Sequence, residues 1–153
     1  MNFARSAQRA LVSTHIRLYE LTGGAIGKSL AGLPCLLLGT TGSKSGRSRT
    51  TPLGYAMNGD QFILVASNGG SDQDPYWFHN LELQPAVTIR VGKDVIAGTA
   101  EIMMPGERHY DQRFSLINAK FGGRYYRYQA NTDRPIPLVI ITPTSVALDR
   151  ALS

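Results

Sequence analysis

The sequence contains one cysteine, Cys35, and three histidines among 153 residues. A single cysteine excludes a disulfide within the chain, and because Cys35 lies in the apolar run LPCLLLG, we expect a buried, unreactive thiol. The histidines, His15, His79 and His109, lack the close spacing of metal ligands, so no metal site is predicted. No run approaches the roughly 18 apolar residues of a membrane span, and the N-terminus lacks the apolar core of a signal peptide. We therefore expect a cytoplasmic protein.

Common nucleotide and nucleophile motifs are also missing. A P-loop needs glycine before its lysine and a helix after it, but Ser43 precedes Lys44 and an extended segment follows. No GxGxxG opens a helix, and the run at 42–46, GSKSG, has lysine where a nucleophile elbow has serine. Nucleotide hydrolysis and serine hydrolysis are therefore not expected.

Acidic residues are absent from 21–59, although the whole chain has a net charge of only +5. This region holds the segment from Gly39 to Tyr55, GTTGSKSGRSRTTPLGY, which we call the cationic segment. Its glycines let successive N–H groups point at one acceptor, and its lysine and arginines add charge suited to phosphate or carboxylate. The segment predicts a phosphorylated or otherwise strongly anionic ligand.

The pattern of apolar and turn-forming residues predicts one α+β domain over 1–153. An amphipathic helix is expected over 3–21, within an N-terminal unit of 1–24 that ends at a pair of glycines. Hairpin turns then separate about six mostly antiparallel strands, which favours a small barrel with peripheral helices. The expected strands are 36–41, 50–57, 61–67, 86–91, 95–104 and 138–142, and later helices are expected from Pro75 (capped by Asp74), Pro105 and Arg124.

The first helix has two interpretations. Its apolar stripe is accompanied by a mostly basic polar face, so it either packs on the domain, which we favour, or also contacts anionic lipid as a peripheral membrane element. The sequence leaves monomer and homodimer both open. The stripe consists of Phe3, Ala7, Leu11, Leu18 and Leu21.

Two further features suit a flat ligand. Small residues at 67–70 follow a strand and allow a close approach to the backbone, and the aromatic run at 76–78 comes soon after. Tyrosines at 125, 126 and 128 alternate with arginines, but no nucleic-acid-binding motif accompanies them, so no nucleic-acid partner is predicted. These tyrosines either pack a helix on the barrel or form the wall of a substrate pocket.

In their order along the chain, these motifs resemble the deazaflavin-dependent nitroreductase family, the F420-binding branch of the flavin and deazaflavin oxidoreductases with a split β-barrel fold. The resemblance covers nearly the whole chain. It implies an F420-dependent enzyme that transfers a hydride to a small electron-poor acceptor: a quinone, an enone or other activated alkene, or a nitro compound. The sequence segments that show the resemblance are RLYELTGGAIGKSLAGLPCLLLGTTG, SKSGRSRTTPLGY, VASNGGSDQDPYWFHNL, QPAVTIRVG and YQANTDRPIPLVI.

The resemblance also implies roles for individual residues. Tyr125 is the candidate catalytic residue, because a phenol with a pKa near ~10 is protonated at neutral pH and can donate to a developing anion. The phosphate and glutamyl tail of F420 would be bound by Ser43, Lys44, Ser45 and Arg49. The deazaflavin ring would lie against Thr50, Thr51, Pro52, Val65, Ala66, Ser67, Asn68, Tyr76, Trp77 and Asn80. The acceptor would contact Tyr55, Tyr125 and Tyr128.

This chain departs from the nitroimidazole-activating members at two places. Gly54 precedes Tyr55 where they have an aromatic pair, and Phe121-Gly122-Gly123 stands where they have a further tyrosine. These small residues suggest a more open pocket, suited to quinones or activated alkenes. Two alternatives remain: an FMN-binding oxidoreductase of the same fold, and a non-catalytic module that binds a cofactor or lipid. The cationic segment favours F420, whose tail carries more negative charge than the single phosphate of FMN.

Overall fold

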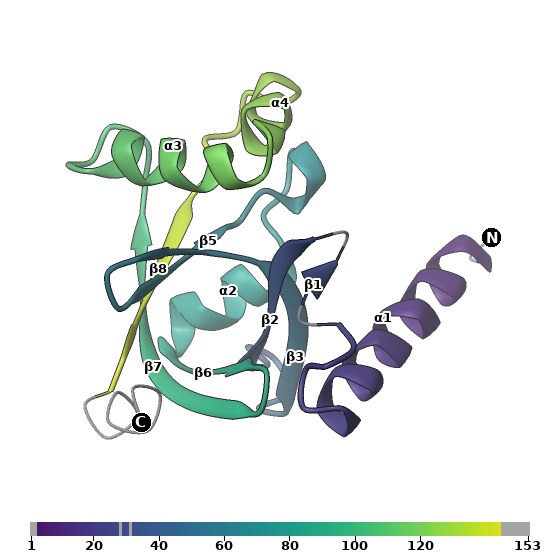
Figure 1. Ribbon diagram of the computed structural model, residues 1–153. Coiled ribbons are helices and arrows are strands. Elements are labelled where there is room, and N and C mark those ends of the chain that lie inside the picture. Colours follow the sequence, from purple (N-terminus) through teal and green to yellow (C-terminus); the bar gives the residue numbers. More distant parts are fainter. Residues whose placement is uncertain (1–2, 28, 31, 145–153) are drawn as a thin grey trace.

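The computed structural model describes residues 3–27, 29–30 and 32–144 (Figure 1). In this part of the chain, eight antiparallel strands form one curled sheet with the order β1-β2-β6-β7-β8-β5-β4, and β3 pairs with β2. The strands are β1 (Ser29–Leu30), β2 (Leu33–Thr41), β3 (Ser48–Gly54), β4 (Ala56–Asn58), β5 (Gln61–Val65), β6 (Ala86–Val91), β7 (Asp94–Met103) and β8 (Leu138–Pro143).

β3 and β4 are two halves of one bent strand and close the barrel. Only Tyr55 separates them. β3 pairs with β2 along its length, whereas β4 pairs with β5 at the other end of the sheet, with Ala56 opposite Ile63. If β3 and β4 are taken as one strand and the two-residue β1 is set aside, six antiparallel strands form the closed path. The prediction of a split β-barrel with about six strands is therefore confirmed.

The barrel interior is an apolar cluster that one helix helps to close. Strand residues alternate between the two faces, so β6 buries Val87 and Ile89 while its intervening side chains are exposed. Helix α2 (Tyr76–Leu83) covers one end of the barrel and packs Trp77, Phe78 and Leu81 into this cluster (Figure 1). The helix begins after Pro75 and ends before Pro85, as expected from the sequence.

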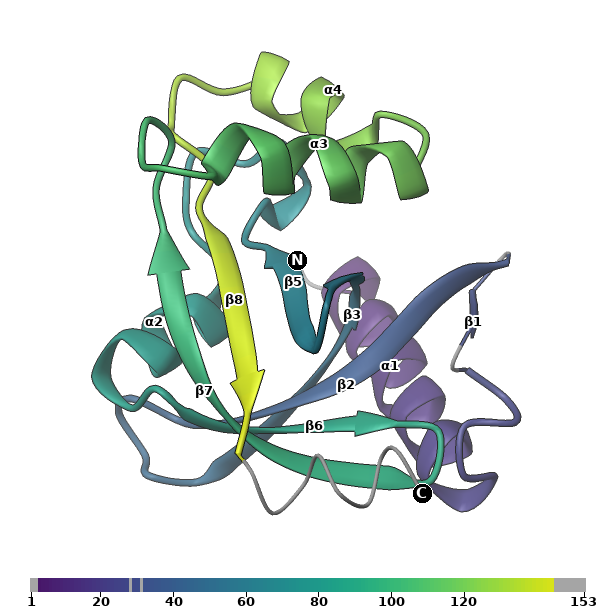
Figure 2. The same cartoon turned by 60° about the vertical axis from the view of Figure 1, so that its left-hand side comes forward.

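A second apolar cluster lies outside the barrel, beneath α3 (Tyr110–Lys120) and α4 (Arg124–Ala130) (Figure 2). Phe114 and Ile117 of α3 pack there with residues of β5 and β8. The Tyr110 hydroxyl donates to the carbonyl of Ile136 at 2.6 Å, which ties α3 to the segment leading into β8. These contacts place α4 above the end of β5, where the candidate site lies.

The helix α1 (Phe3–Leu21) is confirmed and contacts β3 of the domain, but its apolar stripe stays exposed at Ala7, Leu11, Leu18 and Leu21, and the Phe3 side chain lies outside the described residues. Leu11 and Leu21 are 72% and 82% exposed. The buried anchor is instead Tyr19, whose hydroxyl accepts from Gly92 N at 2.8 Å and donates to Arg90 O at 3.0 Å. A long phenol can reach these backbone groups at the end of β6, so Tyr19 anchors the end of α1 to the sheet.

Three local expectations need correction. α3 begins at Tyr110 rather than at Pro105, because turns occupy 105–109 and His109 has a φ of +71°, which a right-handed helix cannot accommodate. Pro75 is the N-cap of α2, and Asp74 pairs with Arg134 instead of capping the helix. The expected strand over 61–67 ends at 65, and a 3-10 turn, η1 (Asn68–Gly70), follows it.

Two further expectations concern the burial of the cysteine and the presence of membrane-spanning helices. Cys35 is 8% exposed, and burial raises the pKa of its thiol, so the prediction of a buried cysteine is confirmed. In the described ranges no helix has the length and apolar character needed to cross a bilayer.

Candidate active site

A pocket of about 930 Å³ opens between β3, the end of β5, the start of α2 and the helix α4. This volume is in the range of cofactor and substrate sites. The sequence-predicted residues that line it are Thr51, Val65, Ser67, Asn68, Tyr76, Trp77, Tyr125 and Tyr128.

The pocket has two walls that come from distant parts of the chain. The first, which we call the ring wall, consists of Thr51 of β3, the segment 65–75 that follows β5, and the first residues of α2. Tyr76 is 91% exposed at its rim, whereas Trp77 is buried. The second, the tyrosine wall, is the face of α4 with Arg124, Tyr125 and Tyr128. A flat ligand and a second molecule can therefore lie between two facing surfaces.

Tyr125 is held firmly in the tyrosine wall. It is 7% exposed, and its ring packs against Phe121 at 5.5 Å and edge-on to Tyr128 at 6.0 Å between centroids. Burial raises the pKa of Tyr125 to about 12, although the nearby Arg124 charge acts in the opposite direction. The phenol is therefore in its neutral, protonated form over the physiological range.

Gly54 lines the pocket, and the opposite wall packs closely against it. A Cβ at this position would lie 2.6 Å from Phe121 Cζ and 3.3 Å from the Tyr125 hydroxyl. The space that an aromatic side chain would take is thus occupied by Phe121 and Tyr125 themselves. The glycine lets the tyrosine wall approach β3 closely, and a pocket more open than in the nitroimidazole-activating members stays a prediction.

The cationic segment forms the β2–β3 hairpin. Gly42 N donates to Arg47 O at 2.7 Å and Gly46 N donates to Gly42 O at 2.9 Å, with Gly46 at a φ of +66° that favours glycine. The side chains at 43–50 are exposed. They lie outside the pocket lining, but β3 runs directly from them to Thr51 in the ring wall.

Asn80 connects the cationic segment to α2. Its side chain is buried, its Oδ1 accepts from Ser43 N at 3.0 Å, and its Nδ2 donates to Thr40 Oγ1 at 3.1 Å. Because Tyr76 and Trp77 are on the same helix, these bonds set the hairpin in a defined place relative to the ring wall. Asn80 does not line the pocket, and the structure thus places it as a support for the loop.

Four other predicted residues do not reach the pocket lining. Side chains on a strand alternate, so Thr50 and Pro52 point away from the face that carries Thr51. Ala66 is fully buried. Tyr55 packs on Phe62, with 5.6 Å between ring centroids, and belongs to the barrel interior. The assignment of Tyr55 to the acceptor therefore finds no support in the pocket geometry.

Sequence reasoning missed several residues of the pocket. Gln8 reaches it from α1, Asp72 and Gln73 from the loop after η1, and Arg124 from the start of α4. Only the arginines between the tyrosines gave a signal that could have identified Arg124. Asp72 and Gln73 lie in the motif VASNGGSDQDPYWFHNL but were given no role, and Gln8 comes from a helix without a site motif.

A family model described as F420H(2)-dependent quinone reductase matches residues 11–143. The chain belongs to this family. It is 41% identical over 133 residues to the F420H(2)-dependent quinone reductase Rv1261c of Mycobacterium tuberculosis, with 86% of this chain and 89% of the relative covered. The predicted membership in the F420-binding branch and the predicted oxidoreductase class are confirmed.

Solved structures agree with this assignment. The chain is similar to a structure described as F420-H2 dependent reductase (FDR-A), with a TM-score of 0.64 and 32% identity over 71% of this chain and 93% of the other. A second structure, described as a domain-swapped dimer, has a TM-score of 0.67 and 30% identity, covering 84% of this chain and 94% of the other. The split-barrel fold is thus shared with relatives at clear sequence identity.

Proposed function

We propose that this reductase transfers a hydride from reduced F420 to a quinone-like acceptor. The observation that carries the proposal is the pocket of about 930 Å³ between the ring wall and the tyrosine wall, which β3 connects to the loop of the cationic segment. Membership in the F420H(2)-dependent quinone reductase family supports both the cofactor and the class of acceptor.

The chemistry of the cationic segment fits the acidic half of F420. Lys44 and Arg49 offer an ammonium and a guanidinium, Ser43 and Ser45 offer hydroxyls, and no carboxylate occurs anywhere in 21–59. Such donors suit a phosphate and several carboxylates together. We propose that these four residues bind the phosphate and the glutamyl tail, and that Thr51, Val65, Ser67, Asn68, Tyr76 and Trp77 lie against the ring.

The mechanism assigns separate tasks to the cofactor and to the protein. Reduced F420, when bound, supplies the hydride from the carbon that replaces the central flavin nitrogen. The ring wall orients the cofactor, and the tyrosine wall holds the acceptor and excludes water from its reacting side. Reduction of a quinone to a hydroquinone consumes one hydride and one proton. We propose that the Tyr125 hydroxyl donates this proton to the acceptor oxygen and is reprotonated from solvent.

A side-by-side titration tests the proposed cofactor. Trp77 is the only tryptophan and lines the pocket, so its fluorescence reports occupancy. We expect F420 to quench it at micromolar concentration, and FMN to do so only at concentrations at least tenfold higher. Reduced F420 should then be oxidised on addition of a soluble naphthoquinone. Tighter binding of FMN, or binding of F420 without turnover of any quinone, enone or nitro acceptor, would contradict the proposal.

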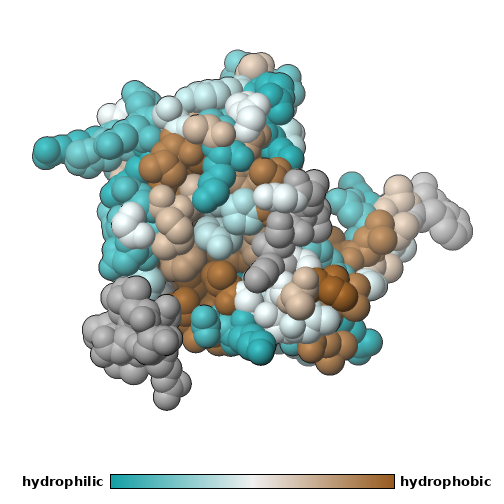
Figure 3. Space-filling model, viewed as in Figure 1, coloured by the Kyte–Doolittle hydropathy of each residue, from teal (hydrophilic) through white to brown (hydrophobic). Residues whose placement is uncertain are grey.

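We also propose that α1 rests on an anionic membrane surface. Its exposed apolar side chains form a stripe with the loop after it, and its N-terminal half carries Arg5 and Arg9. Brown, apolar surface is visible along this helix in Figure 3. Such a helix binds lipid through both its apolar area and its charge. The large exposed apolar side chains are Leu11, Leu18 and Leu21 of the helix and Ile26 of the loop.

Sedimentation with vesicles tests this contact. The wild type should bind vesicles that contain anionic lipid and not neutral ones, and Leu11→Asp with Leu21→Asp should reduce the bound fraction severalfold. Leu83→Asp is the matched control, because Leu83 is 69% exposed but lies on α2. If the wild type stays in solution and forms a homodimer that the stripe variant dissociates, a second copy of the chain covers the stripe instead.

A further inference from the structure

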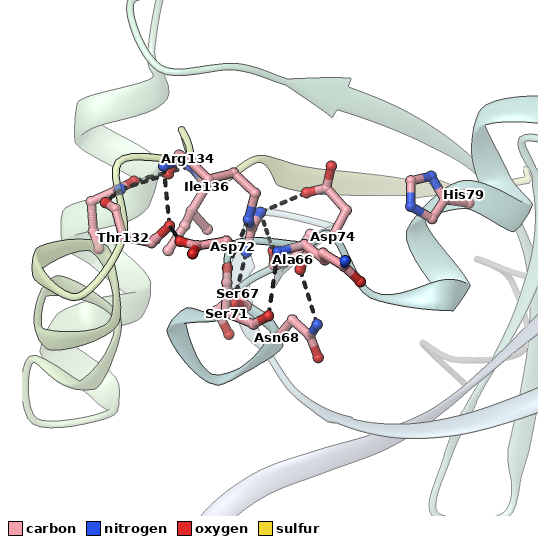
Figure 4. A network of polar contacts seen from close by, with 12 residues as sticks. Ala66, Ser67, Asn68, Ser71, Asp72, Asp74, His79, Thr132, Arg134 and Ile136 are labelled. Atoms are coloured by element: carbon pink, nitrogen blue, oxygen red, sulfur yellow. Dashed lines mark hydrogen bonds and ion pairs between the residues drawn. The ribbon is translucent and has the colours of Figure 1, made fainter.

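Arg134 is an almost buried cation that lies in the motif YQANTDRPIPLVI but has no assigned role and does not line the pocket. It lies between α4 and β8, and its side chain is 11% exposed (Figure 4). Every partner of its guanidinium is in the segment that follows β5. Nη2 donates to Ser67 O at 2.9 Å, Nε to Ser71 O at 2.9 Å, and Nη1 to Ala66 O at 3.3 Å and to Asp74 Oδ1 at 2.5 Å.

These four contacts span most of the loop that forms the ring wall. Ser67 and Asp74 both line the pocket, and Asn68 lies between the Arg134 contacts. Three of the acceptors are backbone carbonyls, which fix the path of the chain itself and not only one side chain. A guanidinium has a rigid, planar set of donors, so it can hold several acceptors in one geometry where a lysine cannot.

The same region is also bonded to the helix of the tyrosine wall. Thr132 Oγ1 donates to Asp72 Oδ1 at 2.6 Å and accepts from Arg134 N at 3.1 Å. Gln129, in α4, donates from Nε2 to Arg134 O at 2.8 Å. A Cβ on Gly70 would lie 2.9 Å from Tyr128 O, so the two walls touch through their backbones at this point.

We infer that Arg134 is a positioning residue of the reductase, which sets the separation between the ring wall and the tyrosine wall. The inference rests on the proposed function, because it concerns the placement of a ring on one wall and an acceptor on the other. Hydride transfer requires the reacting atoms to be about 3 to 3.5 Å apart, and a misplacement of about 1 Å can lower the rate roughly 100-fold. Loss of Arg134 should therefore slow turnover more than it weakens cofactor binding.

The test compares Arg134→Met and Arg134→Lys with Arg113→Met. Arg113 is a matched control: it is also partly buried and donates to Gln61 Oε1 at 3.2 Å, but it lies outside the pocket. We expect Arg134→Met to lower kcat about tenfold or more, with the Kd for F420 changing less than about threefold. Arg134→Lys should recover part of the loss, and Arg113→Met should keep kcat within about twofold of wild type.

Amide hydrogen exchange supplies a reading that does not depend on turnover. Exchange should accelerate at 67–75 in Arg134→Met and should stay as in the wild type in the barrel strands. If Arg134→Met does not fold, Thr132→Val, which removes one hydroxyl and its bond to Asp72, should still lower kcat about threefold and accelerate exchange in the same loop.

Three results would overturn the inference: kcat of the folded Arg134 variants within twofold of wild type, an equal fall in kcat for Arg113→Met, or unchanged exchange at 67–75. A wild type that binds F420 but reduces no acceptor contradicts the proposed function alone. The placement of the ring wall is then judged by exchange at 67–75 and by quenching of Trp77 with F420.

Discussion

Replacing Lys44 and Arg49 together by alanine should weaken F420 binding about 100-fold or more. A hydrogen bond to a charged group contributes about 1.5 to 3 kcal/mol, and about 1.4 kcal/mol corresponds to a tenfold change in Kd. Two such contacts to the phosphate and glutamyl tail therefore account for a loss of this size. The fold should be retained, because both side chains are exposed. Quenching of Trp77 fluorescence, measured at fixed ionic strength, gives the Kd.

The control for this experiment removes the same charge elsewhere. Arg108 and Lys120 are both exposed and outside the pocket lining. Arg108 precedes α3, and Lys120 is the last residue of that helix. Their double replacement by alanine should change the Kd less than about threefold, since only long-range attraction is lost. Raising the salt concentration should weaken binding in the wild type more than in the Lys44 and Arg49 double variant. Equal Kd values for the wild type and the Lys44 and Arg49 double variant would contradict the proposal that the cationic segment binds the acidic half of the cofactor.

Tyr125→Phe should lower kcat about 10- to 100-fold while the Kd for F420 stays within about twofold. Positioned proton transfer typically contributes a factor of 100 or more, and water can replace part of it. Phenylalanine keeps the ring that packs between Phe121 and Tyr128, so the wall itself should be preserved. Steady-state kinetics with one quinone, together with the Trp77 titration, separates turnover from binding. A variant with wild-type kcat would remove the role of Tyr125 as proton donor.

The pKa of Tyr125 adds a test of pH dependence. Because burial raises this pKa to about 12, the phenol stays protonated through pH 10, and any fall in kcat between pH 7 and 10 belongs to another group. The raised pKa also contributes to stability below pH 10, the ordinary value, and this contribution is lost as pH rises from 10 through 12. The free energy of unfolding should therefore fall less steeply with pH in that interval for Tyr125→Phe than for the wild type. Denaturant unfolding followed by circular dichroism at each pH measures it.

Much of the fold could be predicted from the sequence because its signals are local. Turn residues such as Gly92 predict hairpins independently of the rest of the fold. Pro75 and Pro85 mark the two ends of a helix, because proline restricts the backbone around it. The split barrel itself came from the resemblance of several motifs in order. The exceptions are informative: turns occupy 105–109 where a helix was expected, because one residue, His109, takes a positive φ that no local pattern signalled.

The site was predicted in part for the same reason. The cationic segment is contiguous, so its composition alone indicated an anionic ligand, and the aromatic run at 76–78 is contiguous as well. The alternation of side chains along β3 could not be assigned without its pairing partners, so Thr50 and Pro52 were predicted beside Thr51 although they face the other way. Asn80 was predicted as a residue of the ring site, but its bonds to Ser43 and Thr40 show a supporting position.

The sequence by itself thus determined the class of fold and the absence of a disulfide, and it predicted where an anionic ligand would bind. Only the tertiary structure decided how α1 is anchored, what surrounds Gly54 and which groups Arg134 binds. Each of these depends on atoms far apart in the chain: Tyr19 reaches Gly92, Phe121 fills the space at Gly54, and Arg134 holds the loop after β5. Local preferences act over a few neighbouring residues, whereas close packing and the pairing of buried polar groups are satisfied only when the whole chain is in place.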